Sequence, residues 1–341
     1  MAITIYGAGA VGGRTGAYLA RTGEDVLLVD KVAEHVEAMN RNGLKISGGA
    51  NFTVPVRACL PEELRGPLGL TILAVKSQDT EAALDVLAPL VGPETLVLSM
   101  QNGLNPQRIA ARIGVERTIG AFINYPADWM GPGHVEQGGP ARIWLGELGG
   151  RRTERLESLG SLLSKMGDTT VHLTDNVYGY IWSKMIYALP LFAQALTDET
   201  IADIFANKSL QPMLITLCGE GVAVAEAAGI KLEIIPPFEP AKMRSRNEAD
   251  MAEAQVVMDR IADHQRPQVK QRSGIWRDIA VRHRPTEVGP QVGAFLDEAE
   301  KQGIATPLIR HLVVMIKEVE RGDRSRGLRN LEELDQYRAN R

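Results

Sequence analysis

The chain has 341 residues, and 38 Lys and Arg against 42 Asp and Glu give a formal net charge of −4. At roughly 100–200 residues per domain, this length predicts two domains. Hydrophobic residues make up 44% and charged residues 23% of the chain, which excludes a disordered protein. The near-neutral charge gives no electrostatic reason to expect nucleic acid or an anionic membrane as a partner.

The sequence also predicts where the protein resides. A predicted strand, Ile3–Tyr6, starts so early that no signal peptide is expected before it. The longest apolar run, Met185–Ala193, is far shorter than the roughly 18–20 residues that a membrane span needs. The two cysteines, Cys59 and Cys218, form no Cys-x-x-Cys spacing and suit a reducing compartment. We expect a soluble, cytoplasmic protein.

Strand-like and helix-like stretches alternate in the first half. The predicted strands are Ile3–Tyr6, Asp25–Val29, Leu70–Val75, Thr95–Ser99, Thr118–Asn124, Arg142–Gly146 and Thr170–Leu173. The predicted helices are Val11–Arg21, Ala33–Asn40, Thr80–Leu90 and Glu154–Lys165. Short apolar strands that alternate with helices predict a doubly wound parallel sheet, here a Rossmann-type α/β domain over residues 1–174.

Strand signals end after about Asp175. The predicted helices that follow are Asn176–Leu196, Leu210–Ala228, Glu248–Asp263, Gly274–Arg282, Val288–Gln302 and Pro307–Arg321. The charged tail after Gly322 is expected to be a solvated helix or a loose end. We therefore expect an all-helical domain over residues 175–341.

Two of these helices predict the oligomeric state. Leu210–Ala228 and Pro307–Met315 carry more apolar residues than a small helical domain is expected to bury by itself. This excess predicts a homodimer that forms through the helical half.

A glycine-rich turn follows the first predicted strand. The residues Gly7-Ala8-Gly9-Ala10-Val11-Gly12 form a G-x-G-x-x-G motif between a strand and a helix. In dinucleotide-binding proteins the first glycine allows the tight turn, the second admits the pyrophosphate, and the third lets helix pack on strand. The alternative is a glycine-rich turn that binds no ligand.

An acidic residue ends the second predicted strand. Asp30 lies 23 residues after Gly7, close to the spacing of about 20 expected for the acid that binds a ribose 2′-hydroxyl. A carboxylate at this place would repel the 2′-phosphate of NADP, so Asp30 favours NAD. Lys31 could instead pair with a phosphate, and Asp30 could merely cap the next helix.

One lysine lies on an almost wholly apolar helix. Lys184 shares a stripe with Val177, Ile181 and Ala188. A buried lysine has a lowered pKa and exchanges its proton more readily near neutral pH. Lys184 is therefore a candidate general acid that delivers a proton to a carbonyl oxygen. The alternative is a lysine whose ammonium extends to the surface.

These features resemble the ketopantoate reductase (2-dehydropantoate 2-reductase) family over nearly the whole chain. The motifs that carry the resemblance are Gly7–Gly12, Ala74-Val75-Lys76-Ser77, Gln101-Asn102-Gly103, Trp182-Ser183-Lys184 and Pro285-Thr286-Glu287-Val288. The resemblance implies a C-terminal domain like that of 6-phosphogluconate dehydrogenase. It also implies an active site in the cleft between the two domains.

The resemblance assigns roles to four residues. It implies that Lys184 is the general acid, that Asn102 places nicotinamide and substrate, that Lys76 lines the cleft near the cofactor, and that Glu287 binds a substrate hydroxyl. Lys76 and Asn102 each follow a predicted strand, where open α/β sheets bind ligands. The alternatives are a surface lysine for Lys76, an Asn-Gly turn for Asn102 and a helix-start acid for Glu287.

The chain departs from the family pattern in the predicted substrate pocket. The family usually carries asparagines four and eight residues after the lysine, where this chain has Ala188 and Phe192. A serine expected four residues before Asp278 is replaced by Gly274, although Ser273 is adjacent. A pocket that has lost these hydrogen-bonding groups is expected to prefer a less polar or larger substrate.

We therefore expect an oxidoreductase that moves hydride between NAD and a small 2-oxo or 2-hydroxy acid. The alternatives are an NAD-dependent dehydrogenase that oxidises a different hydroxy acid, and a non-catalytic NAD-binding sensor. None of the six histidines forms a metal-ligand spacing, so no metal is expected.

Overall fold

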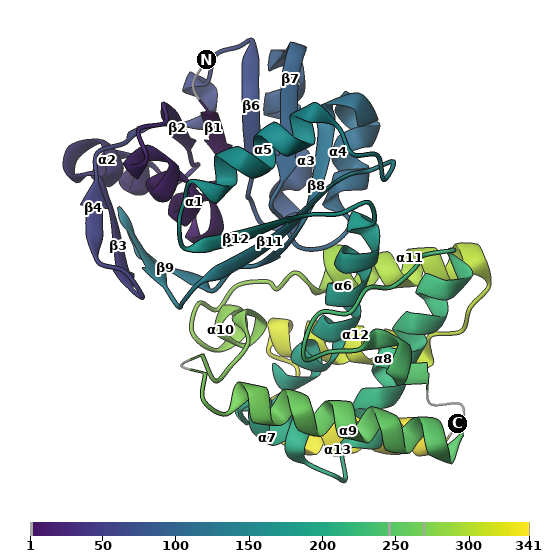
Figure 1. The fold of residues 1–341 in the computed structure, drawn as a ribbon. Coiled ribbons are helices and arrows are strands. Elements are labelled where there is room, and N and C mark those ends of the chain that lie inside the picture. Colours follow the sequence, from purple (N-terminus) through teal and green to yellow (C-terminus); the bar gives the residue numbers. More distant parts are fainter. Residues whose placement is uncertain (1–2, 245–246, 269, 341) are drawn as a thin grey trace. The chain divides into compact units, whose positions relative to one another are not determined.

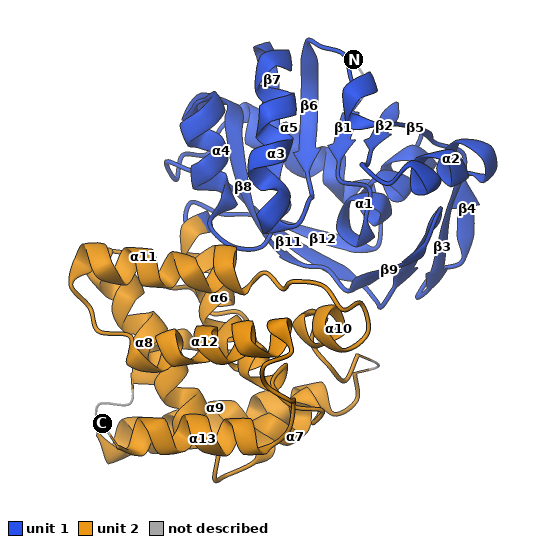
Figure 2. Ribbon diagram, turned by 180° about the vertical axis from the view of Figure 1, so that it is seen from behind, with its two compact units in different colours: residues 1–177 blue, residues 178–341 orange. Residues whose placement is uncertain are grey.

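The computed structural model describes residues 3–244, 247–268 and 270–340. The chain divides into two compact units, residues 1–177 and residues 178–341 (Figure 2). The division falls three residues after the predicted boundary at residue 174, directly after Val177, the first residue of the helix that leads into unit 2.

An eight-stranded sheet forms the centre of unit 1 (Figure 1). In sheet order its strands are β12 (Thr169–Leu173), β11 (Ala141–Glu147), β8 (Thr118–Asn124), β7 (Val91–Ser99), β6 (Leu68–Leu73), β1 (Ile3–Tyr6), β2 (Val26–Val29) and β5 (Arg57–Cys59). All seven predicted strands are present, and β5 is additional. The six strands from β8 to β5 are parallel, as predicted.

The predicted parallel sheet is mixed at one edge. β11 pairs antiparallel with β8 and parallel with the edge strand β12, so β11 and β12 run opposite to the other six. The apolar composition that marked these strands as buried does not encode their direction.

A second sheet was not predicted. It has four short strands in the order β4 (Phe52–Val54), β3 (Leu44–Gly48), β10 (His134–Gln137) and β9 (Ala127–Gly131). Glycines with positive φ end two of them, Gly48 at 89° and Gly131 at 152°. Strands of three to five residues that are bounded by glycine resemble loops in a sequence.

Helices cover both faces of the main sheet. They are α1 (Ala10–Arg21), α2 (Ala33–Asn42), α3 (Thr80–Leu87), α4 (Asn105–Ile113) and α5 (Glu154–Ser164), and α4 was not predicted. Ile5 belongs to a core cluster that includes residues of α1 and α5, whereas Tyr6 belongs to one that includes residues of α3 and α4. Successive strand residues face opposite sides, so these two cores confirm the doubly wound arrangement.

Unit 2 is helical, as predicted. Its helices are α6 (Val177–Gln194), α7 (Ile201–Ala206), α8 (Gln211–Ala227), α9 (Glu248–Gln265), α10 (Gly274–Ala280), α11 (Gly293–Gln302), α12 (Pro307–Arg321) and α13 (Arg329–Ala339). α7 was not predicted, and α13 lies in the charged tail. Over the residues described for this unit, the only β pairing is an isolated bridge between Ile235 and Phe238.

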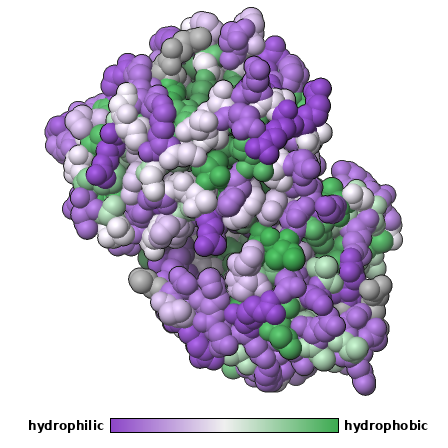
Figure 3. All heavy atoms as spheres, viewed as in Figure 1, coloured by the Kyte–Doolittle hydropathy of each residue, from purple (hydrophilic) through white to green (hydrophobic). Residues whose placement is uncertain are grey.

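The helices that suggested a homodimer bury most of their apolar residues within this chain, although Val314 of α12 is 51% exposed. Leu214 and Leu217 of α8 and Leu312 and Ile316 of α12 are all 0% exposed. This burial leaves little apolar surface on the two helices, and the homodimer stays a prediction. Figure 3 shows a mostly hydrophilic face on which apolar residues form separate patches. Within the described ranges, no helix has both the length and the apolar character that a membrane span requires.

Candidate active site

The glycine-rich turn connects β1 to α1, and its first and third glycines are sterically required. Gly7 has a φ of 98°, and a Cβ there would lie 2.8 Å from the backbone nitrogen of Val75. A Cβ at Gly12 would lie 2.0 Å from the carbonyl oxygen of Gly7. A Cβ at Gly9 would meet nothing within 4 Å. The turn is thus closely packed on both sides of Gly9 and open at Gly9 itself.

The N-terminus of α1 is suited to an anion. Gly9 is its N-cap, and among the described residues no side chain caps the helix and its first turn holds no acid. The first N–H groups of a helix, here those of Ala10, Val11 and Gly12, have no partner within the helix and carry its positive end. This arrangement, together with the open space at Gly9, fits a dinucleotide pyrophosphate.

Asp30 contacts the glycine-rich turn directly. Its Oδ2 accepts a hydrogen bond from the Ala8 N–H at 2.9 Å, and its Oδ1 accepts one from the Val32 N–H at 3.0 Å. The carboxylate therefore bonds to the backbone of Val32, the N-cap residue of α2, and also reaches the predicted dinucleotide site. Lys31 is 70% exposed and donates to Asp79 Oδ1 at 2.8 Å.

Lys76 and Asn102 follow neighbouring parallel strands. Leu73 of β6 pairs with Ser99 of β7. Lys76 and Asn102 each follow one of these strand ends by three residues, so both lie at the carboxyl edge of the sheet. The two loops are joined because the Asn102 carbonyl accepts hydrogen bonds from Ser77 Oγ at 2.9 Å and from Asn105 Nδ2 at 2.6 Å. Lys76 is half-buried at this edge.

The side chain of Asn102 has an unused acceptor. Gln101 fixes the backbone before it, since Gln101 Nε2 donates to the Val75 carbonyl at 3.1 Å and to Thr80 Oγ1 at 2.8 Å. Asn102 Oδ1 is buried and has no hydrogen-bond partner among the residues that the structure describes. A buried acceptor without a partner is costly, which favours a ligand that donates a hydrogen bond to it.

The residues next to Lys184 anchor α6 in unit 2. The Trp182 ring is buried and meets the Phe295 ring edge-on, with 5.2 Å between centroids. Ser183 Oγ is buried and accepts a hydrogen bond from the Glu233 N–H at 3.0 Å. These contacts fix the rotation of α6 and hence the direction in which Lys184 leaves the helix.

The surroundings of Lys184 change its acidity. Burial lowers the pKa of this ammonium to about 8, the nearby Glu287 carboxylate opposes that shift, and Lys270 adds to it. The lysine therefore exchanges its proton near neutral pH, as a general acid must. The structure thus brings Lys184 and Glu287 together in unit 2, although 103 positions separate them in the sequence.

Glu287 lies on a segment that α12 holds in place. It is 7% exposed and precedes a single π-helical turn, η6 (Val288–Val292). Both the N–H and the hydroxyl of Thr286 donate to Glu320 Oε1, at 2.7 and 2.6 Å. Glu320 and Asn105 were missed in the sequence because nothing in their spacing linked them to the site residues that they hold.

The residues that depart from the family pattern have structural roles. Phe192 is 1% exposed and belongs to the core, so the expectation that it changes the wall of a substrate pocket is wrong. Ala188 is half-buried. Ser273 caps α10, since its Oγ accepts the Trp276 N–H at 3.0 Å.

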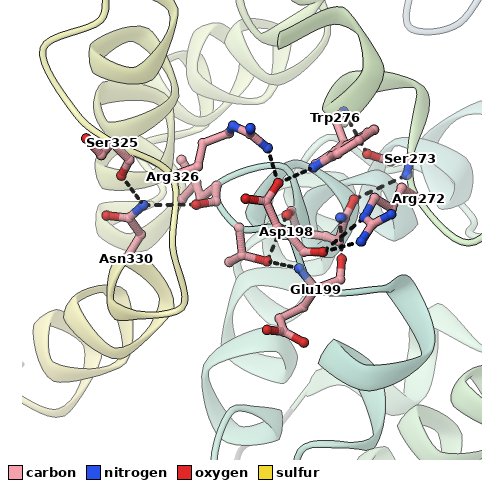
Figure 4. A network of polar contacts seen from close by, with 11 residues as sticks. Asp198, Glu199, Arg272, Ser273, Trp276, Ser325, Arg326 and Asn330 are labelled. Carbon is pink, nitrogen blue, oxygen red and sulfur yellow. Dashed lines mark hydrogen bonds and ion pairs between the residues drawn. The ribbon is translucent and has the colours of Figure 1, made fainter. Parts of the chain in front are cut away.

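The segment from Arg272 to Trp276 surrounds Asp198 (Figure 4). Arg272 donates to the Asp198 carbonyl through Nε at 2.9 Å and Nη2 at 2.8 Å, and Trp276 Nε1 donates to Asp198 Oδ1 at 3.1 Å. Arg326 pairs with the same carboxylate. These polar groups tie α10 and the C-terminal segment to the loop after α6.

The arginines that follow α10 also have an acidic partner. The carboxylate of Asp278 is buried and pairs with Arg284 at 2.7 Å and Arg282 at 3.4 Å. Two arginines of this run therefore neutralise a buried acid within unit 2.

Comparison with known proteins identifies the family. Residues 3–150 match the family model described as ketopantoate reductase PanE/ApbA, and residues 176–320 match its C-terminal counterpart. The chain belongs to the ketopantoate reductase family. As a member it is a nicotinamide-dependent 2-oxo acid reductase.

Several known proteins are similar to this chain over most of their length. A 2-dehydropantoate 2-reductase of Mesorhizobium japonicum is 34% identical, over 69% of this chain and 78% of its own. A 2-dehydropantoate 2-reductase of Streptococcus pyogenes is 28% identical over 93% of this chain and 97% of its own. The structure of a D-mandelate dehydrogenase with NADH and anilino(oxo)acetate aligns with a TM-score of 0.81 at 25% identity, covering 94% and 99%. The structure of a ketopantoate reductase from Ralstonia eutropha aligns with a TM-score of 0.79 at 27% sequence identity. The alignment covers 94% of this chain and 99% of that one.

Proposed function

We propose that the protein uses NADH to reduce a 2-oxo acid and that Lys184 is its general acid. The observation that carries this proposal is a half-buried lysine with a pKa lowered to about 8 beside the carboxylate of Glu287. A sensor that only binds NAD has no need of such a lysine.

Residues of unit 1 would hold the cofactor. The turn Gly7–Gly12 would bind the pyrophosphate, Asp30 would accept from a ribose hydroxyl, and Lys76 and Asn102 would lie near the nicotinamide. The cofactor, when bound, supplies the hydride. The open space at Gly9 and the unpartnered Asn102 Oδ1 support this assignment.

We propose NAD rather than NADP as the cofactor. The carboxylate of Asp30 would repel a 2′-phosphate, and Lys31, which could attract one, is paired with Asp79. The D-mandelate dehydrogenase structure that resembles this chain contains NADH, which supports the same choice.

The residues of unit 2 would handle the substrate and its proton. As hydride reaches the carbonyl carbon, negative charge develops on the carbonyl oxygen, and the Lys184 ammonium would donate a proton to that oxygen. Glu287 would bind a hydroxyl or ammonium group of the substrate and would favour the charged form of Lys184. Asn102 would accept a hydrogen bond from a ligand N–H or O–H.

The substrate is proposed to differ from 2-dehydropantoate. Ala188 offers no hydrogen bond where the family usually has an asparagine, so a less polar or larger 2-oxo acid is favoured. A second candidate function is the oxidation of a 2-hydroxy acid, which the similarity to a D-mandelate dehydrogenase favours. NADH oxidation with 2-dehydropantoate and with phenylglyoxylate compares the two 2-oxo acids, and NAD⁺ reduction with mandelate tests the oxidation.

Replacement of the lysine tests the mechanism. Lys184→Ala should lower kcat by roughly 10²–10⁴-fold, the usual contribution of general acid catalysis, while the Kd for NADH stays within about twofold. The control is Lys208→Ala, which removes an exposed lysine of unit 2 that pairs with Asp259. Full activity of Lys184→Ala would disprove the assignment, and a wild-type protein that binds NADH without turnover would favour the sensor.

We also propose a cytoplasmic homodimer, for which light scattering and cell fractionation are the tests. The composition and the two unpaired cysteines support the location, and no particular surface is assigned to the dimer.

A further inference from the structure

A buried histidine lies beside the glycine-rich turn. His35 is in the first turn of α2 and is 1% exposed. Its Nε2 lies 2.9 Å from the carbonyl oxygen of Ala8, and its Nδ1 lies 2.9 Å from the backbone nitrogen of Gly133, between β9 and β10. The imidazole thus joins the turn after β1 to the second sheet.

Its two partners determine the protonation of the ring. A backbone N–H can only donate, so Nδ1 must accept from Gly133 and carries no proton. A carbonyl oxygen can only accept, so Nε2 must carry the proton that it donates to Ala8. Both ring nitrogens of His35 are therefore engaged, and the Trp129 ring packs against the imidazole edge-on at 5.9 Å between centroids.

The hydrogen bond to Ala8 also orients the next backbone donor. The Ala8 carbonyl and the Gly9 N–H belong to one planar trans peptide, in which the two groups point in opposite directions. A carbonyl directed at buried His35 turns the Gly9 N–H away from the buried side. The preceding peptide is fixed as well, because Asp30 accepts from the Ala8 N–H. Two successive peptides of the turn are therefore held by side chains of other elements.

We propose that His35 is a positioning residue that directs the Gly9 N–H toward the dinucleotide phosphates. This proposal rests on the binding of NADH in the proposed function. Gly9 is where the turn is open, and His35 contacts the turn at the buried carbonyl of Ala8, the residue before it. The residue acts through the backbone and touches neither substrate nor cofactor.

The effect of its loss follows from the burial of this peptide. Ala8 is 0% exposed, so its carbonyl would lack a partner without His35 and the peptide could rotate. Rotation lowers the fraction of molecules in which the Gly9 N–H is ready to bind. The apparent affinity for NADH falls in proportion to that fraction. Turnover at saturating NADH should be little affected.

Two substitutions separate this role from simple support of the fold. His35→Gln keeps an amide N–H near the position of Nε2 and can still donate to Ala8, but loses the acceptor for Gly133. His35→Asn keeps an acceptor near Nδ1 for Gly133 but loses the donor to Ala8. Each variant loses one buried hydrogen bond, so similar falls in Tm without NADH are expected.

The readout is the Kd for NADH, measured by fluorescence titration, beside kcat at saturating NADH. We expect His35→Asn to weaken NADH binding about tenfold and His35→Gln to stay within about threefold, with kcat within about twofold in both. The control is His134→Gln, since His134 of β10 bonds to Ser47 in the same sheet and should leave the Kd unchanged.

The outcomes distinguish the two proposals. Equal weakening by both His35 variants, or wild-type affinity in His35→Asn, would overturn the positioning role while leaving the proposed function intact. A wild-type protein that fails to bind NADH would overturn the proposed function itself.

Discussion

Lys184 lies near two charges of opposite sign. Glu287 raises its pKa and Lys270 lowers it, while burial brings it to about 8. A general acid must be protonated, so kcat/KM for reduction should fall as pH rises through about 8. Glu287→Gln removes the negative charge and should move this fall to lower pH. Lys270→Gln removes the positive charge and should move it to higher pH.

The measurement is the pH profile of kcat/KM for each variant with the same 2-oxo acid. Because kcat/KM reports ionisations of the free enzyme, the profile can be compared with the ligand-free structure. Shifts in the same direction for the two variants would contradict the assignment of the titrating group to Lys184.

Asp30 is the residue that should decide between the two cofactors. Asp30→Asn keeps an oxygen that can accept from the Ala8 N–H but removes the charge that opposes a 2′-phosphate. We expect the ratio of the Kd for NADPH to that for NADH to fall about tenfold, which is roughly 1.4 kcal/mol. Fluorescence titration of wild type and variant provides the comparison. Tighter binding of NADPH than NADH by the wild type would show that Lys31 outweighs Asp30.

The connection between β1 and α1 contains glycines with different tasks. An alanine at Gly12 would place its Cβ 2.0 Å from the Gly7 carbonyl oxygen, whereas one at Gly9 meets nothing within 4 Å. Gly9→Ala should therefore fold with a Tm near that of wild type and lose most NADH affinity, because its methyl group enters the phosphate space. Gly12→Ala should be strongly destabilised. Thermal unfolding and NADH titration test both, and unchanged NADH binding in Gly9→Ala would contradict the assigned phosphate site.

The elements with strong periodicity were predictable. Strands such as Ile3–Tyr6 and Thr118–Asn124 have the predicted bounds because they are apolar on both faces. The second sheet was not predictable, because β4 has only three residues and β10 only four. The reversed direction of β11 and β12 depends on pairing across the sheet, which periodicity does not report.

The site was predictable only in part, for a similar reason. Asn102 and Lys76 could be placed together because each follows a strand of a parallel sheet, and such strands end at one edge. Lys184 and Glu287 were assigned to one site only through the family resemblance, since no local sequence pattern links them. His35 had no signal at all, because its role depends on Ala8 and Gly133, which are distant in the sequence.

The whole molecule consists of two compact units, each with its own buried apolar residues, such as Leu28 in unit 1 and Leu214 in unit 2. The proposed NADH contacts all belong to unit 1. NADH at a concentration of 100 times its Kd stabilises the bound form by roughly 2.7 kcal/mol. Amide hydrogens that exchange only after NADH has dissociated should therefore exchange up to about 100-fold more slowly. We expect this protection in Gly7–Gly12 and Gln101–Asn105 and little in α9. Equal protection of both units would contradict the assignment.

The hydrogen bonds that join the loops after β6 and β7 have a consequence for protein engineering. Ser77 and Asn105 come from different loops, yet both donate to the carbonyl of Asn102. A chimera that takes only one of these loops from a relative would leave mismatched donors and acceptors in a buried place. The two loops therefore form a single structural unit. A design that aims to change substrate preference should replace Lys76–Thr80 and Gln101–Asn105 together.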